Sequence, residues 1–336
     1  MITIKSVADY SGFSISTVSN YLNGKPVSKE AAKKISLAIE ELGYQPNFFG
    51  RSLRTKKTFS VGVIVFDLAT QFIADICTEL EKFLHHKGYD VFFCNTNGDV
   101  EIEKEKINCL INRGVDAIVI FPRSYYHTDI SAALNADIPI ITLDGMLHDN
   151  KCSSISFDDE QAAYLATKYL IKNGHKEIAY IAGHNDYYTT IARQKGYEQA
   201  LRDANIKNKY LCTDISDDCT DRCLNFFYIN TNITATLISS SSLLVDFLSA
   251  AKMLSLKIPD DISYVTFDNS SYFKILNTTP TYVYQDKVHF ANELNNVLDE
   301  LLSDPKVITN KTISTHLKIG RSVKQLKETT SNVTYF

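Results

Sequence analysis

Apolar side chains in the first 46 residues recur at the three- to four-residue spacing of short amphipathic helices. Three helices are predicted, over residues 4 to about 10, 15 to about 22 and 28 to 42. Each begins at or just after a Thr or Ser, residue types that cap helix N-termini, and a glycine follows the first and third. The pattern predicts a helix-turn-helix with one supporting helix.

A short connection follows this head. Pro46 ends the helical pattern, Asn47 is a new N-cap candidate, and residues 48 to 54 form a helical stretch of about two turns. Residues 47–60 are therefore predicted to be a hinge helix and linker.

From Val61 the pattern changes to short, nearly continuous apolar runs separated by amphipathic segments of helical spacing. The runs cover residues 61–66, 89–95, 115–121, 138–144, 153–157, 178–183, 235–240, 262–268 and 313–320. Apolar runs joined by helices are typical of parallel sheets that are buried on both faces. About ten strands predict two doubly wound lobes, with a ligand cleft beyond the carboxyl ends of the strands.

The predicted fold is therefore multidomain: an all-α helix-turn-helix head and an α/β core of two parallel-sheet lobes. We place the head at 1–46, the hinge at 47–60 and the core at 61–336. The chain is expected to cross between the lobes near 158, 285 and 311. The charged run at 101–106 is expected to be the solvated face of a helix.

Charge is distributed unevenly along the 336 residues. Residues 1–60 have a formal charge of +5, whereas the remainder has −9. A basic head on an acidic body is expected when only the head contacts a polyanion such as nucleic acid. A basic surface that is merely solvated remains the alternative.

Candidate metal and cofactor chemistry is absent from the sequence. The seven cysteines form no C-x-x-C pair and are expected to be inert thiols, and no phosphate-binding glycine motif occurs. We therefore expect no metal and no cofactor. The N-terminus has no signal-peptide pattern and no apolar run approaches a membrane span, so a cytoplasmic location without membrane contact is expected.

Several motifs in order resemble the LacI/GalR family of bacterial transcriptional regulators over nearly the whole chain. The head, TIKSVADYSGFSISTVSNYLNGKPVS (3–28), resembles the family's DNA-binding signature, and ELGYQPN (41–47) with RSLRT (51–55) resembles its hinge. YLIKNGHKEIAYIAG (169–183), RQKGYEQAL (193–201) and IPDDISYVTFD (258–268) are similar to its effector-domain landmarks. The resemblance implies a periplasmic-binding-protein-like core.

The resemblance also implies DNA-binding residues. Ile15, Ser16 and Asn20 match the positions that read bases, where Asn can pair with adenine and Ile can contact a thymine methyl. The phosphate contacts are expected from Ser6, Thr17, Asn23 and Lys33. Leu53 matches the apolar wedge that enters the minor groove.

Effector contacts are implied for six residues of the core: Phe72, Asp144, Thr189, Arg193, Ser240 and Asp268. Carboxylates with an arginine suit the vicinal hydroxyls of a sugar, although the same groups could instead form ion pairs that span the lobes. Ser240-Ser241 stands where sugar-responsive members commonly carry Asn-Asp, so the effector is predicted only as a sugar or related metabolite.

The sequence thus predicts a homodimeric, sequence-specific DNA-binding regulator, a repressor under allosteric control by an effector, and not an enzyme. Its partners are a pseudo-palindromic operator, the effector and a second copy, which is expected to meet the face of Phe72, Ile76, Leu80 and Phe83. The alternatives are a cytoplasmic solute-binding protein, and a cleft glycosidase that uses Asp144 and Asp268 as its carboxylate pair.

Overall fold

The head is a three-helix unit with its own small core. The computed structural model describes residues 2–22, 25–44, 57–149, 151–213 and 219–326, which divide into two compact units, Met1–Phe59 and Ser60–Phe336. In the first unit lie α1 (Ile4–Ser11), α2 (Ile15–Leu22) and α3 (Lys29–Leu42). The predicted hinge helix, with Leu53, and the turn residue Asn23 lie outside the described residues.

Local capping sets the ends of the head helices. The Thr3 hydroxyl accepts the N–H of Ser6, the Ser28 hydroxyl accepts that of Ala31, and Gly43 closes α3 in a left-handed conformation with φ 58°. The inward faces of the three helices form one core, in which Val18 and Ile35 are wholly buried. The predicted helix-turn-helix is confirmed.

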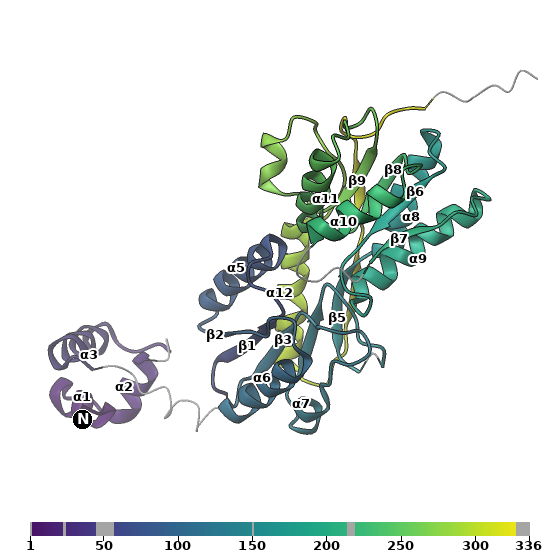
Figure 1. Ribbon diagram of the computed structural model, residues 1–336. Helices are drawn as coiled ribbons and strands as arrows, with labels where there is room; N and C mark the ends of the chain where they lie inside the picture. The colour runs from purple at the N-terminus through teal and green to yellow at the C-terminus, as the bar shows by residue number, and fades with distance from the viewer. Residues whose placement is uncertain (1, 23–24, 45–56, 150, 214–218, 327–336) are drawn as a thin grey trace, which may run out of the picture. The chain divides into compact units, whose positions relative to one another are not determined.

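The first lobe of the second unit is a six-stranded parallel sheet in the order β11-β5-β4-β3-β1-β2. Its strands are β1 (Ser60–Val65), β2 (Asp90–Asn95), β3 (Ala117–Ile120), β4 (Ile140–Leu143), β5 (Ser153–Phe157) and β11 (Asn310–Ile313). Its helices are α5 (Gln71–His86), α6 (Val100–Arg113), α7 (Ser131–Asn135) and α12 (Lys287–Ser303). The hydrophobic clusters put α5 and α12 on one face of the sheet and α6 and α7 on the other (Figure 1).

The second lobe repeats this plan with the order β12-β10-β9-β8-β6-β7. Its strands are β6 (Ile178–Ile181), β7 (Tyr210–Cys212), β8 (Ala235–Ile238), β9 (Ser263–Phe267), β10 (Thr281–Tyr284) and β12 (His316–Lys318). Helices α8 (Asp159–Lys172) and α9 (Tyr188–Asp203) cover one face, and α10 (Cys219–Ile229) and α11 (Ser241–Met253) cover the other. A short 3-10 helix, η1 (Ser271–Ile275), follows β9.

The chain passes between the two sheets after β5, after β10 and after β11. The run 313–320, predicted as one strand, is in fact shared between the end of β11 and β12, which belong to different sheets. Strand β12 pairs antiparallel with β10 because the chain enters the second sheet from its carboxyl edge. The two-lobed α/β class is confirmed, with this one antiparallel edge.

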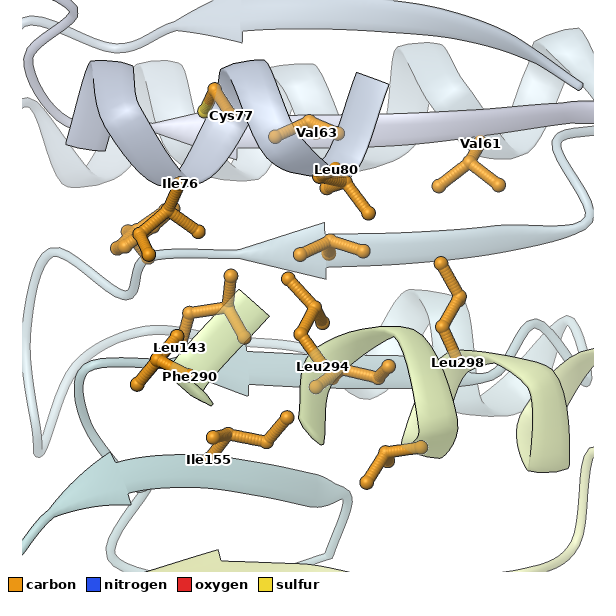
Figure 2. Close-up of a cluster of buried hydrophobic side chains, with 14 of the residues drawn as sticks. Val61, Val63, Ile76, Cys77, Leu80, Leu143, Ile155, Phe290, Leu294 and Leu298 are labelled. Atoms are coloured by element: carbon orange, nitrogen blue, oxygen red, sulfur yellow. The ribbon is translucent and has the colours of Figure 1, made fainter. Parts of the chain in front are cut away.

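The predicted dimerisation face is wrong, because its side chains belong to the core of the first lobe. Phe72 is 7% exposed, while Ile76 and Leu80 are wholly buried and Phe83 packs against the same cluster. Figure 2 shows Ile76 and Leu80 of α5 directed at the sheet, with Leu294 of α12 in the same cluster. The helical periodicity of α5 correctly indicated an apolar face, but it could not tell whether the sheet of the same chain or a second copy covers that face.

Two further expectations need correction. Strand β2 is not buried on both faces: it lies at the sheet edge, and Phe92 and Phe93 are 37% and 42% exposed. The charged run at 101–106 is not wholly solvated, since Glu103 is fully buried and its Oε2 accepts the backbone N–H of Arg123 at 2.8 Å. That bond ties α6 to the loop after β3.

Candidate functional sites

The outward face of α2 is the candidate DNA-reading surface. Ser16 and Asn20, one helical turn apart, are exposed, and Ile15 is 47% exposed. Val18, on the opposite face, is wholly buried against α1 and α3. The helix therefore exposes one apolar side chain, one hydroxyl and one amide, while its opposite, apolar face packs against the other two helices.

Hydroxyl groups organise the N-terminus of α2. The Ser14 Oγ accepts the N–H of Thr17 at 3.2 Å and lies 2.7 Å from the Ser16 Oγ and 2.8 Å from the Thr17 Oγ1. These contacts stabilise the first turn of α2 and leave the Asn20 side chain out of this network. The free N–H groups of such a first turn, with the helix dipole, also suit a phosphate.

Of the predicted phosphate contacts, Thr17 lies partly exposed in the first turn of α2, and two others lie on the other helices of the head. Lys33 is exposed on α3, and Ser6 is partly exposed on α1, where its hydroxyl also accepts the N–H of Thr3 at 3.3 Å as half of a capping box. Lys34, next to Lys33, is engaged by Glu30 at 2.9 Å.

The second candidate site is a cavity of about 680 Å³ between the lobes of the core, within the usual range for small-molecule sites. Residues that follow the strands line it: Phe66 after β1, Asn97 after β2, Arg123 after β3, Asp144 after β4, Gly183 after β6, Ser239 after β8 and Asp268 after β9. All six residues predicted to contact an effector line this cavity: Phe72, Asp144, Thr189, Arg193, Ser240 and Asp268.

Arg193, in the second turn of α9, is at the centre of the polar wall. It is 5% exposed; its Nε donates to Asp159 Oδ1 at 2.6 Å, its Nη1 donates to the Ser239 carbonyl, and its guanidinium lies 4.0 Å from the centre of the Phe267 ring. Burial opposes its charged form, but the carboxylates of Asp159, Asp144 and Asp268 outweigh that effect and raise its pKa. Since α8 and α9 both belong to the second lobe, the Arg193 ion pair does not span the lobes.

Asp144 and Asp268 occupy equivalent places, one residue beyond β4 and β9. Both adopt the left-handed conformation, with φ of 53° and 65°, which aspartate tolerates better than most residues. The Asp268 Oδ2 accepts the N–H and the hydroxyl of Ser241 at 3.0 and 3.1 Å. The Asp144 Oδ1 is closed off from solvent and has no hydrogen-bond partner among the described residues.

The carboxylates around Arg193 are crowded. Burial raises the pKa of Asp144 well above its ordinary value, and the neighbouring Asp159 raises it further. Burial also raises the pKa of Asp159, whereas the ion pair with Arg193 opposes that rise. Asp144 and Asp159 therefore hold protons more tightly than isolated carboxyls do, which is typical of functional sites.

The other residues predicted to contact the effector also stabilise the fold. Ser240 is the N-cap of α11, where its Oγ accepts the N–H of Leu243 at 3.3 Å. Thr189 is partly buried in the first turn of α9. Phe72 packs edge-on against Phe157 and Phe290 in the first-lobe core, so only its rim reaches the cavity.

A contact that we call the interlobe clasp closes one wall of the cavity. It joins Asp186 and Tyr187 of the second lobe to Phe66, Arg123 and Tyr125 of the first. The Arg123 Nη1 lies 2.9 Å from Asp186 Oδ1, and the Tyr125 N–H donates to the Asp186 carbonyl at 2.8 Å. The Tyr187 ring stacks on Phe66 at 5.3 Å and has the Arg123 guanidinium 4.7 Å from its centre. This is an ion pair that does span the lobes.

Sequence reasoning missed Asp159, Arg123 and Tyr187. The rule that ligands bind beyond the carboxyl ends of strands could have found the first two, because Asp159 and Arg123 each lie two residues beyond a recognised apolar run. Tyr187 has no such signal, since it follows a loop whose length is not readable from periodicity.

Within the described ranges, no three metal-binding side chains come together, and no helix is both long and apolar enough to cross a bilayer. All seven cysteines are among the described residues and none forms a disulfide; four are buried, but Cys109 is exposed.

Comparison with known proteins gives consistent matches along the chain. Residues 3–47 match the family described as bacterial regulatory proteins, lacI family, and residues 58–298 match periplasmic binding proteins and sugar binding domain of LacI family. The HTH-type transcriptional repressor PurR of Histophilus somni is 30% identical over 94% of this chain and 100% of its own length. PurR of Aliivibrio fischeri is 30% identical over 95% of this chain and 100% of its length.

Solved structures share the fold. The Lac repressor dimer bound to operator and the anti-inducer ONPF superposes with a TM-score of 0.83 at 23% identity, covering 96% of this chain and 99% of that one. A complex of the transcriptional regulator CelR with cellobiose gives a TM-score of 0.69 at 21% identity, covering 96% and 100%.

Proposed function

Because the chain belongs to the LacI family of bacterial regulatory proteins, we propose that it is an operator-binding transcriptional repressor controlled by a small molecule bound between its core lobes. The observation that carries the DNA-binding role is the head, in which α2 exposes Ser16 and Asn20 while Val18 is buried. The curated relatives are repressors, and this chain is likewise a regulator and not an enzyme.

We assign operator choice to Ile15, Ser16 and Asn20, since base-edge contacts specify sequence. The residues Ser6, Thr17, Asn23 and Lys33 would hold phosphates, which position the head without reading sequence. Leu53 would be the minor-groove wedge from the proposed hinge. The exposure of the α2 face supports the first group.

The effector would bind in the interlobe cavity, in contact with Phe72, Asp144, Thr189, Arg193, Ser240 and Asp268. An effector can change operator affinity only if it binds two states of the protein with different affinities. The interlobe clasp supports this arrangement, because the same loops that line the cavity also join the lobes. The solved relatives bound to an anti-inducer and to cellobiose lend support for a carbohydrate-sized ligand.

We propose that two copies act together on a pseudo-palindromic operator, as the Lac repressor does as a dimer. In place of the buried α5 face, we propose that the edge of β2, with exposed Phe92 and Phe93, contributes to the dimer contact. Exposed apolar side chains on a sheet edge are costly unless something covers them.

The proposed organisation remains a DNA-binding domain at 1–46, a hinge at 47–60 and a core at 61–336. The operator role requires access to chromosomal DNA, so we propose that the protein works in the cytoplasm.

Selection of binding sites from random DNA tests the proposal. The wild type should select a two-fold-related sequence, and Asn20→Ala should relax one base position in each half-site by about 1–3 kcal/mol. Lys33→Ala should weaken binding to all sequences alike and lessen its salt dependence. Lys34→Ala, which removes a side chain already paired with Glu30, serves as the matched control. Selection of no sequence, or an unchanged sequence with Asn20→Ala, would contradict the assignment.

A further inference from the structure

Three of the seven cysteines gather at one place in the second lobe. Cys212 is the last residue of β7, and Cys219 and Cys223 lie one helical turn apart at the start of α10. Cys212 and Cys223 belong to the hydrophobic cluster that joins α10 to β7, and Cys219 packs against it. No C-x-x-C pair marks these thiols in the sequence, but the fold brings them together.

The three thiols differ in their access to solvent. Cys212 is 3% exposed and Cys223 is wholly buried, whereas Cys219 is partly exposed. Of these three described thiols, Cys219 is the one that lines the interlobe cavity. Reagents attack exposed thiols much faster than buried ones, so a small solute in the cavity reacts first with Cys219.

The two buried thiols are paired with each other. The Cys223 thiol donates a hydrogen bond to the Cys212 sulfur, and this bond lowers the pKa of Cys212 although burial opposes that effect. The charge of Cys219 also acts on Cys223, so Cys223 interacts with both of the other thiols. Two sulfur atoms that share a hydrogen bond need only a small approach to reach the S–S length of a disulfide, about 2.05 Å.

We propose that Cys219 is a site of oxidation by hydrogen peroxide, and that Cys223 passes the oxidation on to form a Cys212–Cys223 disulfide. Hydrogen peroxide is uncharged and small enough to enter the cavity. Where thiols are kept reduced, protein disulfides are mostly transient and serve catalysis or redox sensing. The disulfide would tie α10 to β7, and α10 carries the Thr220 hydroxyl that donates to the cavity-lining Asp246 at 2.8 Å. Oxidation would therefore alter one wall of the cavity.

The reaction has three steps. The Cys219 thiolate attacks one oxygen of the peroxide and the O–O bond breaks, which leaves a sulfenic acid on Cys219 and a hydroxide that takes up the proton lost by Cys219. The Cys223 sulfur then attacks the Cys219 sulfur, the S–O bond breaks, and the hydroxyl leaves as water with the Cys223 proton. Finally Cys212 attacks the Cys223 sulfur, and Cys219 leaves as a thiolate that takes up the Cys212 proton. Two thiols and one peroxide thus become one disulfide and two waters.

Disulfide mapping on the full-length protein tests the proposal. The protein is treated with hydrogen peroxide, the remaining thiols are alkylated at intervals, and mass spectrometry of the peptides follows the Cys212–Cys223 disulfide. We expect this disulfide to form in the wild type and to be reversed by dithiothreitol. Cys219→Ser, at a partly exposed position, should slow its formation by about tenfold or more. Cys109→Ser is the matched control, because it removes an exposed thiol of α6 in the other lobe and should leave the rate unchanged.

A second variant tests the transfer between thiols. In Cys223→Ala the sulfenic acid on Cys219 should accumulate and be captured by dimedone, and no disulfide should form at Cys212. An unchanged rate of disulfide formation in Cys219→Ser would overturn the proposal, as would oxidation of wild-type Cys219 to a sulfinic acid without any disulfide. The measurement uses neither operator nor effector, so its result is independent of the proposed function.

Discussion

Replacing Arg193 with Ala removes the cation that pairs directly with Asp159, a carboxylate whose side chain is fully buried. Breaking a buried ion pair by removing one partner typically costs about 3–5 kcal/mol, because the other charge is left uncompensated. For a unit as large as this core, about 2 °C of Tm is lost per kcal/mol, so the Tm should fall by about 6–10 °C. Arg193 is thus expected to stabilise the folded core, in addition to its proposed contact with the effector.

The assay is thermal unfolding of the effector-free protein, followed by circular dichroism. Arg202→Ala is the matched control, since Arg202 lies on the same helix and its side chain is 59% exposed, with partners only on the solvent side of that helix, Gln199 at 2.8 Å and Glu198 at 3.7 Å. The Tm of this variant should change by less than about 2 °C. Adding Asp159→Asn to Arg193→Ala should recover part of the loss, because the uncompensated charge disappears.

The loss should also depend on pH. The pKa of Asp159 is raised in the folded state, so this carboxyl favours folding at a pH below its ordinary pKa and loses that contribution as pH rises through the folded value. Without Arg193 the folded pKa rises further, and the Tm deficit should be largest near neutral pH and shrink in acid. An Arg193→Ala protein that melts like Arg202→Ala at neutral pH would refute the view of Arg193 as the buried counter-ion.

Three further predictions follow from single contacts. Gly196→Ala should severely destabilise the core, because the new Cβ would lie 2.0 Å from the Glu160 carbonyl oxygen where α8 crosses α9. Gly183→Ala should be tolerated, because the nearest atom to its new Cβ would be 3.8 Å away. The Tm values of the two variants should therefore differ, and equal values would contradict the close approach of the two helices. Burial raises the pKa of Glu103, so the wild type should lose stability relative to Glu103→Gln as pH rises above the ordinary pKa of a glutamate. A Tm difference that does not change with pH would show an ordinary carboxyl. Asp186→Asn weakens the interlobe clasp and should speed hydrogen exchange of the Tyr125 backbone amide by about two- to fivefold. This factor corresponds to the free energy that a partly exposed ion pair contributes. Unchanged exchange would mean that the ion pair does not hold the lobes together.

Much of the fold is readable from the sequence because the apolar runs and caps are local signals. Val63 and Ile118 lie in continuous buried runs that predict central strands, and Ser28 and Gly43 mark the ends of α3. Strands β7 and β10 were not predicted, because three or four residues are too few to show a clear strand pattern.

The candidate sites were less predictable, since burial and pairing are decided between distant segments. The family resemblance selected Asp144 and Asp268, and both line one cavity, but nothing near Arg193 in sequence indicates that Asp159 pairs with it across 34 residues. Periodicity likewise cannot tell that α12, more than 200 residues later, covers the face of α5.

The division of residues 310–318 between two sheets has a consequence for biosynthesis. Strand β11 completes one sheet and β12 the other, and the Leu326 N–H bonds to the Asn173 carbonyl. Neither lobe can therefore reach its final form on the ribosome until these residues have emerged, whereas the head has its whole core once Tyr44 is available. At translation rates of about 5–20 residues per second, the DNA-binding fold precedes the effector-binding fold by about 15–55 s. A nascent chain, or one cut short within the core, carries a head able to fold and no completed core to regulate it.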